Sequence, residues 1–218
     1  MTKHLKIDFV SDVSCPWCAI GLSALNQALE RVSAEVSAQI HFQPFELNPH
    51  MPPGGQDISE HITEKYGSTP QQQAGMRENI RQRGAELGFT FSMAGRSRIY
   101  NTFDAHRLLH WAEFEGKEGQ QAALKQALLK AYFTDGLSPE SHEVLVRLAG
   151  SVGLDESRAR SILVSSEFAE AVREREQLYL DAGIHSVPAI IINNKHLISG
   201  GQPVEVFESA LLKIAANL

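Results

Sequence analysis

The sequence has little cysteine, no long apolar run and no excess of basic residues. Its 218 residues include two cysteines, both within residues 15–18, so any sulfur chemistry is confined to one place. No window approaches the roughly 18 consecutive apolar residues that a membrane-spanning helix needs. The net charge of −6 at pH 7 argues against nucleic acid as the main partner.

The beginning of the chain also lacks the marks of a targeting segment. Residues 1–5 lead directly into a strand pattern, without a basic region, an apolar stretch and a cleavage site in series. With 43% hydrophobic and 21% charged residues, we expect a soluble, globular, cytoplasmic protein. In that reducing compartment a lone cysteine pair is more often catalytic, redox-sensing or metal-binding than structural.

The cysteine pair has the spacing of a redox dithiol. Cys15-Pro16-Trp17-Cys18 follows directly after the alternating apolar pattern of residues 5–10, which is typical of a redox motif where a helix begins. Pro16 suits the first helical position, which puts Cys15 at the N-cap. There, unpaired N–H groups and the positive end of the helix dipole favour a thiolate. Cys18 lies one turn further on the same face and can close a disulfide with Cys15. Trp17 offers an aromatic surface to a partner.

The hydrophobic periodicity predicts a mixed α/β chain. A helix over 16–36 between two strands makes a parallel unit with a right-handed crossover. Residues 57–150 are predicted to be wholly helical, without a strand, and one long helix is predicted from Asp155 to Asp181. The predicted strands are, in chain order, 5–10, 40–43, 187–192 and 196–199, and Asn193-Asn194-Lys195 is predicted to turn the last two into an antiparallel hairpin. A final helix is predicted to begin near residue 203.

This order of elements resembles a thioredoxin fold carrying a helical insertion. The sequence is similar to the DsbA-like oxidoreductases, and within them to the FrnE-type branch. The similarity is carried by residues 12–18, 45–49, 101–108 and 187–189. It implies a thioredoxin-like domain formed by residues 1–50 and 152–218, with a helical domain, 51–151, inserted between the second and third strands.

The resemblance also implies a site. The Val187–Pro188 bond is expected to be cis and to pack beside the dithiol, which leaves the Val187 backbone free to pair with an extended substrate. We expect thiol–disulfide exchange, in which Cys15 attacks a disulfide and Cys18 resolves the mixed disulfide. No cofactor beyond this redox-active pair is expected. The expected partners are disulfide-containing proteins or peptides, with glutathione as a further candidate co-substrate, and neither nucleic acid nor a membrane.

Several other polar residues fall within the matching segments. Asn48, Asn101 and His106 are candidates to line the active-site cleft. Structural roles are favoured for two of them, because Asn101 can cap the following helix and His106 can be a hydrogen-bonded interior residue. The turn formed by residues 200–202 (Gly200, Gly201 and Gln202) places N–H groups at a helix start, which suits either a carboxylate such as that of glutathione or a bare helix cap.

Two other functions compete with disulfide exchange. The kappa-class glutathione transferases and the 2-hydroxychromene-2-carboxylate isomerases share this architecture, but by resemblance they carry a serine at the position of Cys15 and have no resolving cysteine. A zinc site made by Cys15, Cys18, His106 and His110 has suitable ligand types. However, about 87 residues separate the cysteines from the histidines, far beyond compact zinc-finger spacing, so no metal is expected.

Overall fold

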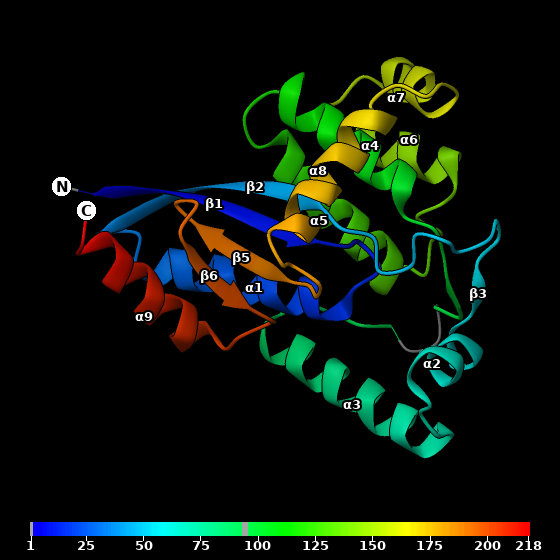
Figure 1. The fold of residues 1–218 in the computed structure, drawn as a ribbon, viewed down its shortest axis with the longest axis horizontal. Helices are drawn as coiled ribbons and strands as arrows, with labels where there is room; N and C mark the ends of the chain where they lie inside the picture. Colours follow the sequence, from blue (N-terminus) through cyan, green and yellow to red (C-terminus); the bar gives the residue numbers. More distant parts are fainter. Residues whose placement is uncertain (1, 93–95) are drawn as a thin grey trace.

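The structure is a computed structural model that describes residues 2–92 and 96–218. Its main sheet has the strand order β2-β1-β5-β6 (Figure 1). β1 pairs in parallel with β2, whereas β5 pairs antiparallel with both β1 and β6. The bounds of these strands are β1 Lys3–Ser11, β2 Val36–Pro44, β5 Ala189–Ile192 and β6 His196–Ser199.

Alternation along β1 divides the core between the two faces of the sheet. Leu5, Ile7 and Phe9 are fully buried in one cluster with residues of α1 (Pro16–Arg31) and α9 (Val204–Ala215). Val10 points to the other face, into a cluster with Tyr179 of α8 (Ala169–Asp181). Figure 1 shows α1 and α9 on one side of the sheet and α8 on the other. Both faces of β1 are therefore covered, which fixes the position of its carboxyl end.

The remaining helices lie between β2 and β5 along the chain. α4 and α5 pack against β2, while α3 packs against α1. Their bounds are α2 Ile58–Tyr66, α3 Pro70–Glu86, α4 Phe103–Phe114, α5 Gln120–Phe133, α6 His142–Ser151 and α7 Glu156–Leu163. This placement agrees with a helical insertion between strands, while the domain boundaries at residues 51 and 151 stay a prediction.

The expectation of a wholly helical region over 57–150 is wrong. A two-stranded antiparallel sheet joins β3 (Gln56–Asp57) to β4 (Arg98–Ile99). The Arg98 guanidinium donates to the backbone carbonyls of Gly54 and Gly55, each at 2.8 Å, and so ties β4 to the turn before β3. Two residues per strand are too few to produce an alternating pattern, so the sequence carried no signal for them.

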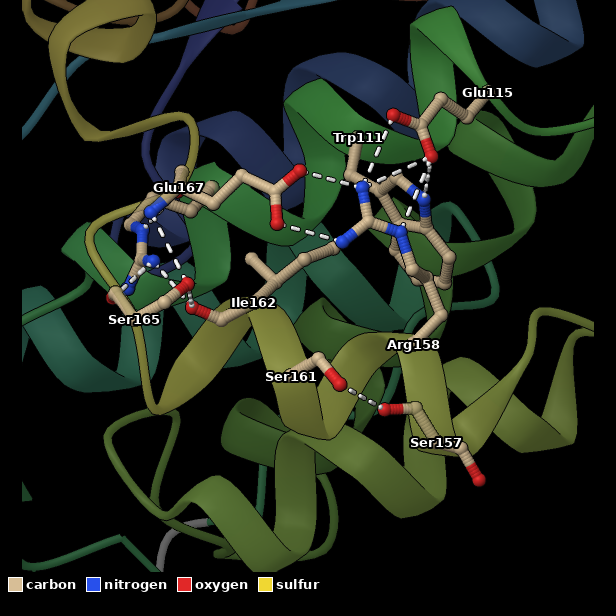
Figure 2. A network of polar contacts seen from close by, with 9 residues as sticks. Trp111, Glu115, Ser157, Arg158, Ser161, Ile162, Ser165 and Glu167 are labelled. Carbon is tan, nitrogen blue, oxygen red and sulfur yellow. Dashed lines mark hydrogen bonds and ion pairs between the residues drawn. The ribbon is translucent and has the colours of Figure 1, made fainter.

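The single long helix expected from Asp155 to Asp181 is also wrong, because α7 and α8 are separate helices. The helical conformation is interrupted between Val164 and Phe168, and Phe168 has a left-handed φ of 60°. The buried Arg107 side chain of α4 donates to three carbonyls at the break, those of Ile162, Ser165 and Glu167. Figure 2 labels these three acceptor residues. A tertiary contact thus supplies donors to carbonyls that would accept backbone N–H groups in a continuous helix.

Two local predictions are confirmed. Pro16 occupies the first position of α1 with Cys15 as its N-cap, although the helix ends at Arg31 and not at residue 36. Asn193 and Asn194 form the β5–β6 hairpin turn with φ values of 51° and 56°, which asparagine tolerates well. None of the described helices is both long and apolar enough to cross a bilayer.

Candidate active site

The dithiol lies at the carboxyl end of β1, where α1 begins. The Cys15 backbone is extended, with φ −90° and ψ 113°, and its carbonyl accepts from Cys18 N at 3.1 Å and Ala19 N at 3.4 Å. Its thiol makes no capping bond and instead donates to the carbonyl of Val187, with Sγ 3.7 Å from the oxygen. Cys15 is 3% exposed and Cys18 is 0% exposed, so Cys15 is the sulfur nearer to solvent.

The segment facing Cys15 contains the cis bond between Val187 and Pro188. Among the described residues, no backbone hydrogen bond involves the N–H or the carbonyl of Val187. The N–H is therefore available to an extended chain laid beside the dithiol, and the carbonyl, which accepts from the Cys15 thiol, has a second lone pair to offer. Pro188 packs on α1 at Gly21, where an added Cβ would lie 3.1 Å from the proline Cγ.

The turn after β6 packs on the same helix. An added Cβ at Gly201 would lie 2.9 Å from the carbonyl oxygen of Trp17, so only glycine fits there without a shift. The N–H of Gly200 donates to Pro188 at 2.8 Å, and that of Gln202 donates to Gly200 at 3.0 Å. Packing against α1 accounts for Gly201, and a left-handed φ of 82° accounts for Gly200, without any ligand.

A buried carboxylate lies directly before the dithiol. Asp12 is 0% exposed, and its backbone carbonyl accepts from Cys15 N at 3.4 Å. Its side chain accepts from the N–H and hydroxyl of Ser14 and from Leu47 N, at 2.8 to 3.1 Å, while His106 Nε2 lies 3.6 Å away. Burial raises the pKa of Asp12, but His106 and these donors outweigh it and lower the pKa to about 2. Asp12 is therefore held as an anion.

The other predicted lining residues differ in their contacts. His106, from α4, is 2% exposed, and its Nε2 lies 3.6 Å from Asp12 Oδ1 without a hydrogen-bond partner among the described residues, so the expected hydrogen bond is not seen for this nitrogen. Asn101 accepts from Phe103 N at 2.9 Å and so stabilises the start of α4, although the N-cap residue is Thr102 and not Asn101. Asn48 accepts from Lys65 Nζ at 2.7 Å.

A family comparison decides the affiliation. The model of the DSBA-like thioredoxin domain matches residues 6–212, which is nearly the whole chain. This chain belongs to the DSBA-like thioredoxin domain family. That confirms the resemblance to DsbA-like oxidoreductases and the fold class, whereas the FrnE-type branch stays a prediction.

Solved structures place this DSBA-like chain among similar folds. It is 31% identical to a probable DsbA oxidoreductase from Streptomyces coelicolor, covering 98% of this chain and 91% of that one, with a TM-score of 0.89. It is 15% identical to a 2-hydroxychromene-2-carboxylate isomerase (97% of each chain, TM-score 0.73). It is 16% identical to the cytosolic disulfide reductase DsbM from Pseudomonas aeruginosa, solved with GSH (98% and 100%, TM-score 0.65). The last two likenesses concern the fold alone.

The DSBA-like site includes a residue that the sequence analysis missed. Lys125 of α5 is 0% exposed, and its Nζ has no hydrogen-bond partner within residues 2–92 and 96–218. Burial lowers the pKa of its ammonium, while attraction to Cys18, Asp12 and Cys15 opposes that shift. A signal was present, because Lys125 stands within the apolar stripe that includes Leu128.

Burial strongly affects the pKa of Cys18, the cysteine expected to resolve the mixed disulfide. Burial raises the pKa of the Cys18 thiol well above its ordinary value, and the neighbouring Cys15 sulfur raises it further. Lys125 acts in the opposite direction and stabilises a Cys18 thiolate. A positive charge on α5 and the Asp12 backbone therefore both favour ionisation of Cys18, against the larger effect of burial.

A small cavity of about 50 Å³ adjoins Pro16. Arg77 and Arg96 line it, and the Arg96 guanidinium stacks 5.0 Å from the ring centre of Tyr132 and 4.8 Å from that of Phe133. The site therefore has positive charge on one side of α1.

The zinc arrangement is not formed by the described residues. No group of three or more His, Cys, Asp or Glu side chains is placed to hold a metal ion in the part of the chain that the structure describes. His110 stacks on Phe114 and Phe168, with ring centres 4.6 and 5.4 Å apart, and burial lowers its pKa. His110 thus belongs to an aromatic cluster.

Proposed function

We propose that this protein is a thiol–disulfide oxidoreductase that acts through Cys15 and Cys18 on disulfides of proteins or low-molecular-weight thiols. One observation carries the proposal: two free cysteines stand one turn apart where α1 begins, with the Cys15 thiol facing the Val187 carbonyl. The DSBA-like family to which the chain belongs generally contains oxidoreductases or isomerases.

The difference in burial supports an order of attack. Cys15, the more accessible sulfur, attacks one sulfur of a substrate disulfide; that S–S bond breaks, a mixed disulfide forms and the first substrate thiolate leaves. Cys18 then attacks the Cys15 sulfur, the internal disulfide forms and the second substrate thiol is released. Two electrons pass from the dithiol to the substrate, and the reverse sequence oxidises a substrate dithiol.

The backbone of Val187 supports an extended peptide substrate. Its N–H and carbonyl lack backbone partners among the described residues and stand beside Cys15. A substrate strand pairing there would hold its cysteine near Cys15 through main-chain bonds, which do not depend on the substrate's side chains. This favours a range of disulfide substrates over a single one.

Single-cysteine variants test the proposal cleanly, because the chain has no other thiol. With insulin as substrate and glutathione as reductant, Cys15→Ser is expected to abolish turnover. Cys18→Ala is expected to accumulate a mixed disulfide, visible as a mass increase that dithiothreitol reverses. Both variants reducing insulin as fast as the parent protein would refute the proposed chemistry.

A glutathione-dependent transferase or isomerase is the second candidate. The fold likeness to the isomerase favours it, together with the Val187 N–H and carbonyl, which have no backbone hydrogen-bond partner among the described residues and suit a tripeptide thiol. Cys15→Ser recreates the serine expected in that class. Conjugation of glutathione to 1-chloro-2,4-dinitrobenzene by this variant, at a rate well above the uncatalysed rate, supports the second candidate; no acceleration removes it.

A further inference from the structure

Two arginine side chains line the small cavity beside Pro16 and have no acidic partner in the described chain. Arg77 comes from α3 and Arg96 from the segment before β4, and both are half-buried. Neither guanidinium forms an ion pair or a hydrogen bond with any residue in 2–92 or 96–218. Residues 93–95 are Met, Ala and Gly, whose side chains carry no carboxylate. Both positive charges are therefore available to an anion from outside.

The rest of the cavity wall is almost entirely apolar. Besides the two arginines and Ser92, it is formed by Pro16, Ile58, Ile80, Phe91 and Phe133. An ion pair in such surroundings is stronger than one in water, because the effective dielectric constant is lower. The volume of about 50 Å³ exceeds the roughly 10–15 Å³ that one water needs, so a group the size of a carboxylate has room there.

Stacking holds the Arg96 guanidinium in place for a planar partner. Its Cζ lies 5.0 Å from the ring centre of Tyr132 and 4.8 Å from that of Phe133. Both rings are buried, and the Tyr132 hydroxyl donates to the carbonyl of Arg98 at 2.9 Å. A guanidinium fixed in this way loses little freedom when it binds, and its N–H groups match a carboxylate in bidentate geometry.

The two guanidinium groups also repel each other across the cavity. Burial lowers the pKa of Arg96, and the positive charge of Arg77 acts in the same direction, whereas Tyr132 and Cys15 oppose the shift. An anion placed between the two arginines relieves this repulsion.

The cavity stands directly beside the attacking cysteine. Pro16, which lines it, is the residue after Cys15, and consecutive Cα atoms are about 3.8 Å apart. Phe91 and Phe133, from the same wall, belong to the buried cluster that contains Cys15. A substrate whose cysteine is joined to Cys15 can therefore place a neighbouring side chain or a chain end in the cavity.

We propose that Arg77 and Arg96 form a subsite for a carboxylate of the substrate, carried within about two residues of its reacting cysteine. This inference rests on the proposed exchange function and adds to it a preference for acidic thiols and disulfides. Glutathione carries such carboxylates, and so does a peptide with an acidic residue beside its cysteine. The main-chain groups of Val187 suit either source, whereas the two arginines distinguish an acidic substrate from a neutral one.

Mixed disulfides with 2-thiopyridine test the subsite, because this leaving group is uncharged and its release is followed by absorbance. One pair of substrates is a capped tripeptide with glutamate on both sides of its cysteine and the same peptide with glutamine. The second pair is glutathione and its diethyl ester. In at least one pair, we expect the reduced parent to react at least about tenfold faster with the acidic member at low ionic strength, as a charge-assisted hydrogen bond allows. A preference in the peptide pair identifies a peptide substrate, and a preference confined to the second pair identifies glutathione.

Arg77→Gln and Arg96→Gln are each expected to bring this rate ratio to within about twofold of one. Arg81→Gln is the matched control and should keep the parent's ratio. It removes the same charge from the same helix as Arg77→Gln, at a side chain that is 46% exposed and paired with Glu78.

Two results overturn the inference: a ratio near one for both pairs in the parent, or a ratio that both arginine variants retain. If Arg96→Gln does not fold, the ratio in Arg77→Gln decides alone. A parent protein that releases no thiopyridone from any of the four substrates, or a Cys15→Ser variant that releases it as fast as the parent, refutes the exchange function itself and the inference with it.

Discussion

Two groups of buried or half-buried cationic side chains in this molecule differ in whether they have hydrogen-bond or ion-pair acceptors. Among the helices, Arg158 reaches the carboxylates of Glu115 and Glu167 (Figure 2), and Arg107 has Asp104 and three backbone carbonyls as acceptors. Beneath the dithiol, Lys125 has no acceptor within the described residues. The matched cations join helices, whereas Lys125 is influenced by the charges of Cys18, Asp12 and Cys15 without a hydrogen bond to any described residue.

The difference has an energetic meaning. A buried guanidinium with complete hydrogen bonding is a structural element, and its removal leaves several acceptors unsatisfied. A buried amine without partners stabilises nothing in the resting protein. Substitutions in the two groups are therefore expected to have opposite signs.

Arg107→Met should have the largest effect on stability. It leaves the carbonyls of Ser165 and Glu167 without their donor, and breaking such a buried set typically costs about 3–5 kcal/mol. Urea unfolding followed by circular dichroism measures the loss. Arg147→Met, at an exposed position on α6, is the control, and equal midpoints for the two variants would contradict the structural role.

Asp12→Asn is expected to cost about 2 kcal/mol at neutral pH. The pKa of Asp12 falls from 3.8 to about 2 on folding, so the folded state binds fewer protons in this range. Its stabilisation is therefore complete above about pH 4 and disappears as the pH falls through about 2. Unfolding free energies of the parent and the variant should converge as the pH falls from 5 to 2; a constant difference would contradict the assignment.

Lys125→Met should have a smaller effect and the opposite sign. Replacing an unpartnered buried amine with an apolar side chain is expected to stabilise the fold by about 1 kcal/mol or more at pH 7. Because burial lowers the pKa of Lys125, the parent's penalty grows as the pH falls below 10.5. The gain measured by denaturant unfolding should therefore shrink between pH 7 and 10, and a loss of stability would show that the amine has a structural partner.

Arg158→Met is expected to have the smallest effect. Its side chain is 32% exposed and its two carboxylate partners are 45% and 40% exposed, so solvent screens the pairs. We expect a loss within about 1 kcal/mol that largely disappears in 1 M salt. A salt-independent loss comparable to that of Arg107→Met would erase the distinction between an exposed and a buried network.

The errors of the sequence analysis share one cause. The break between α7 and α8 depends on Arg107, about 55 residues away from the carbonyls it binds. The β3–β4 pair joins residues about 40 apart through two residues per strand. Local periodicity carries no information about either contact, because neither contact changes the spacing of apolar residues.

The amino-acid sequence by itself determined the position of the dithiol: a proline at the first helical position places Cys15 at the N-cap and Cys18 one turn later, whatever surrounds them. It also determined the hairpin turn, because Asn193 and Asn194 tolerate left-handed backbone. Only the tertiary structure decided what surrounds the sulfurs, bringing Asp12, His106 and Lys125 together beneath them from a loop and two helices. Their burial sets the charges at the site, and burial arises from packing between distant segments, not from any local pattern.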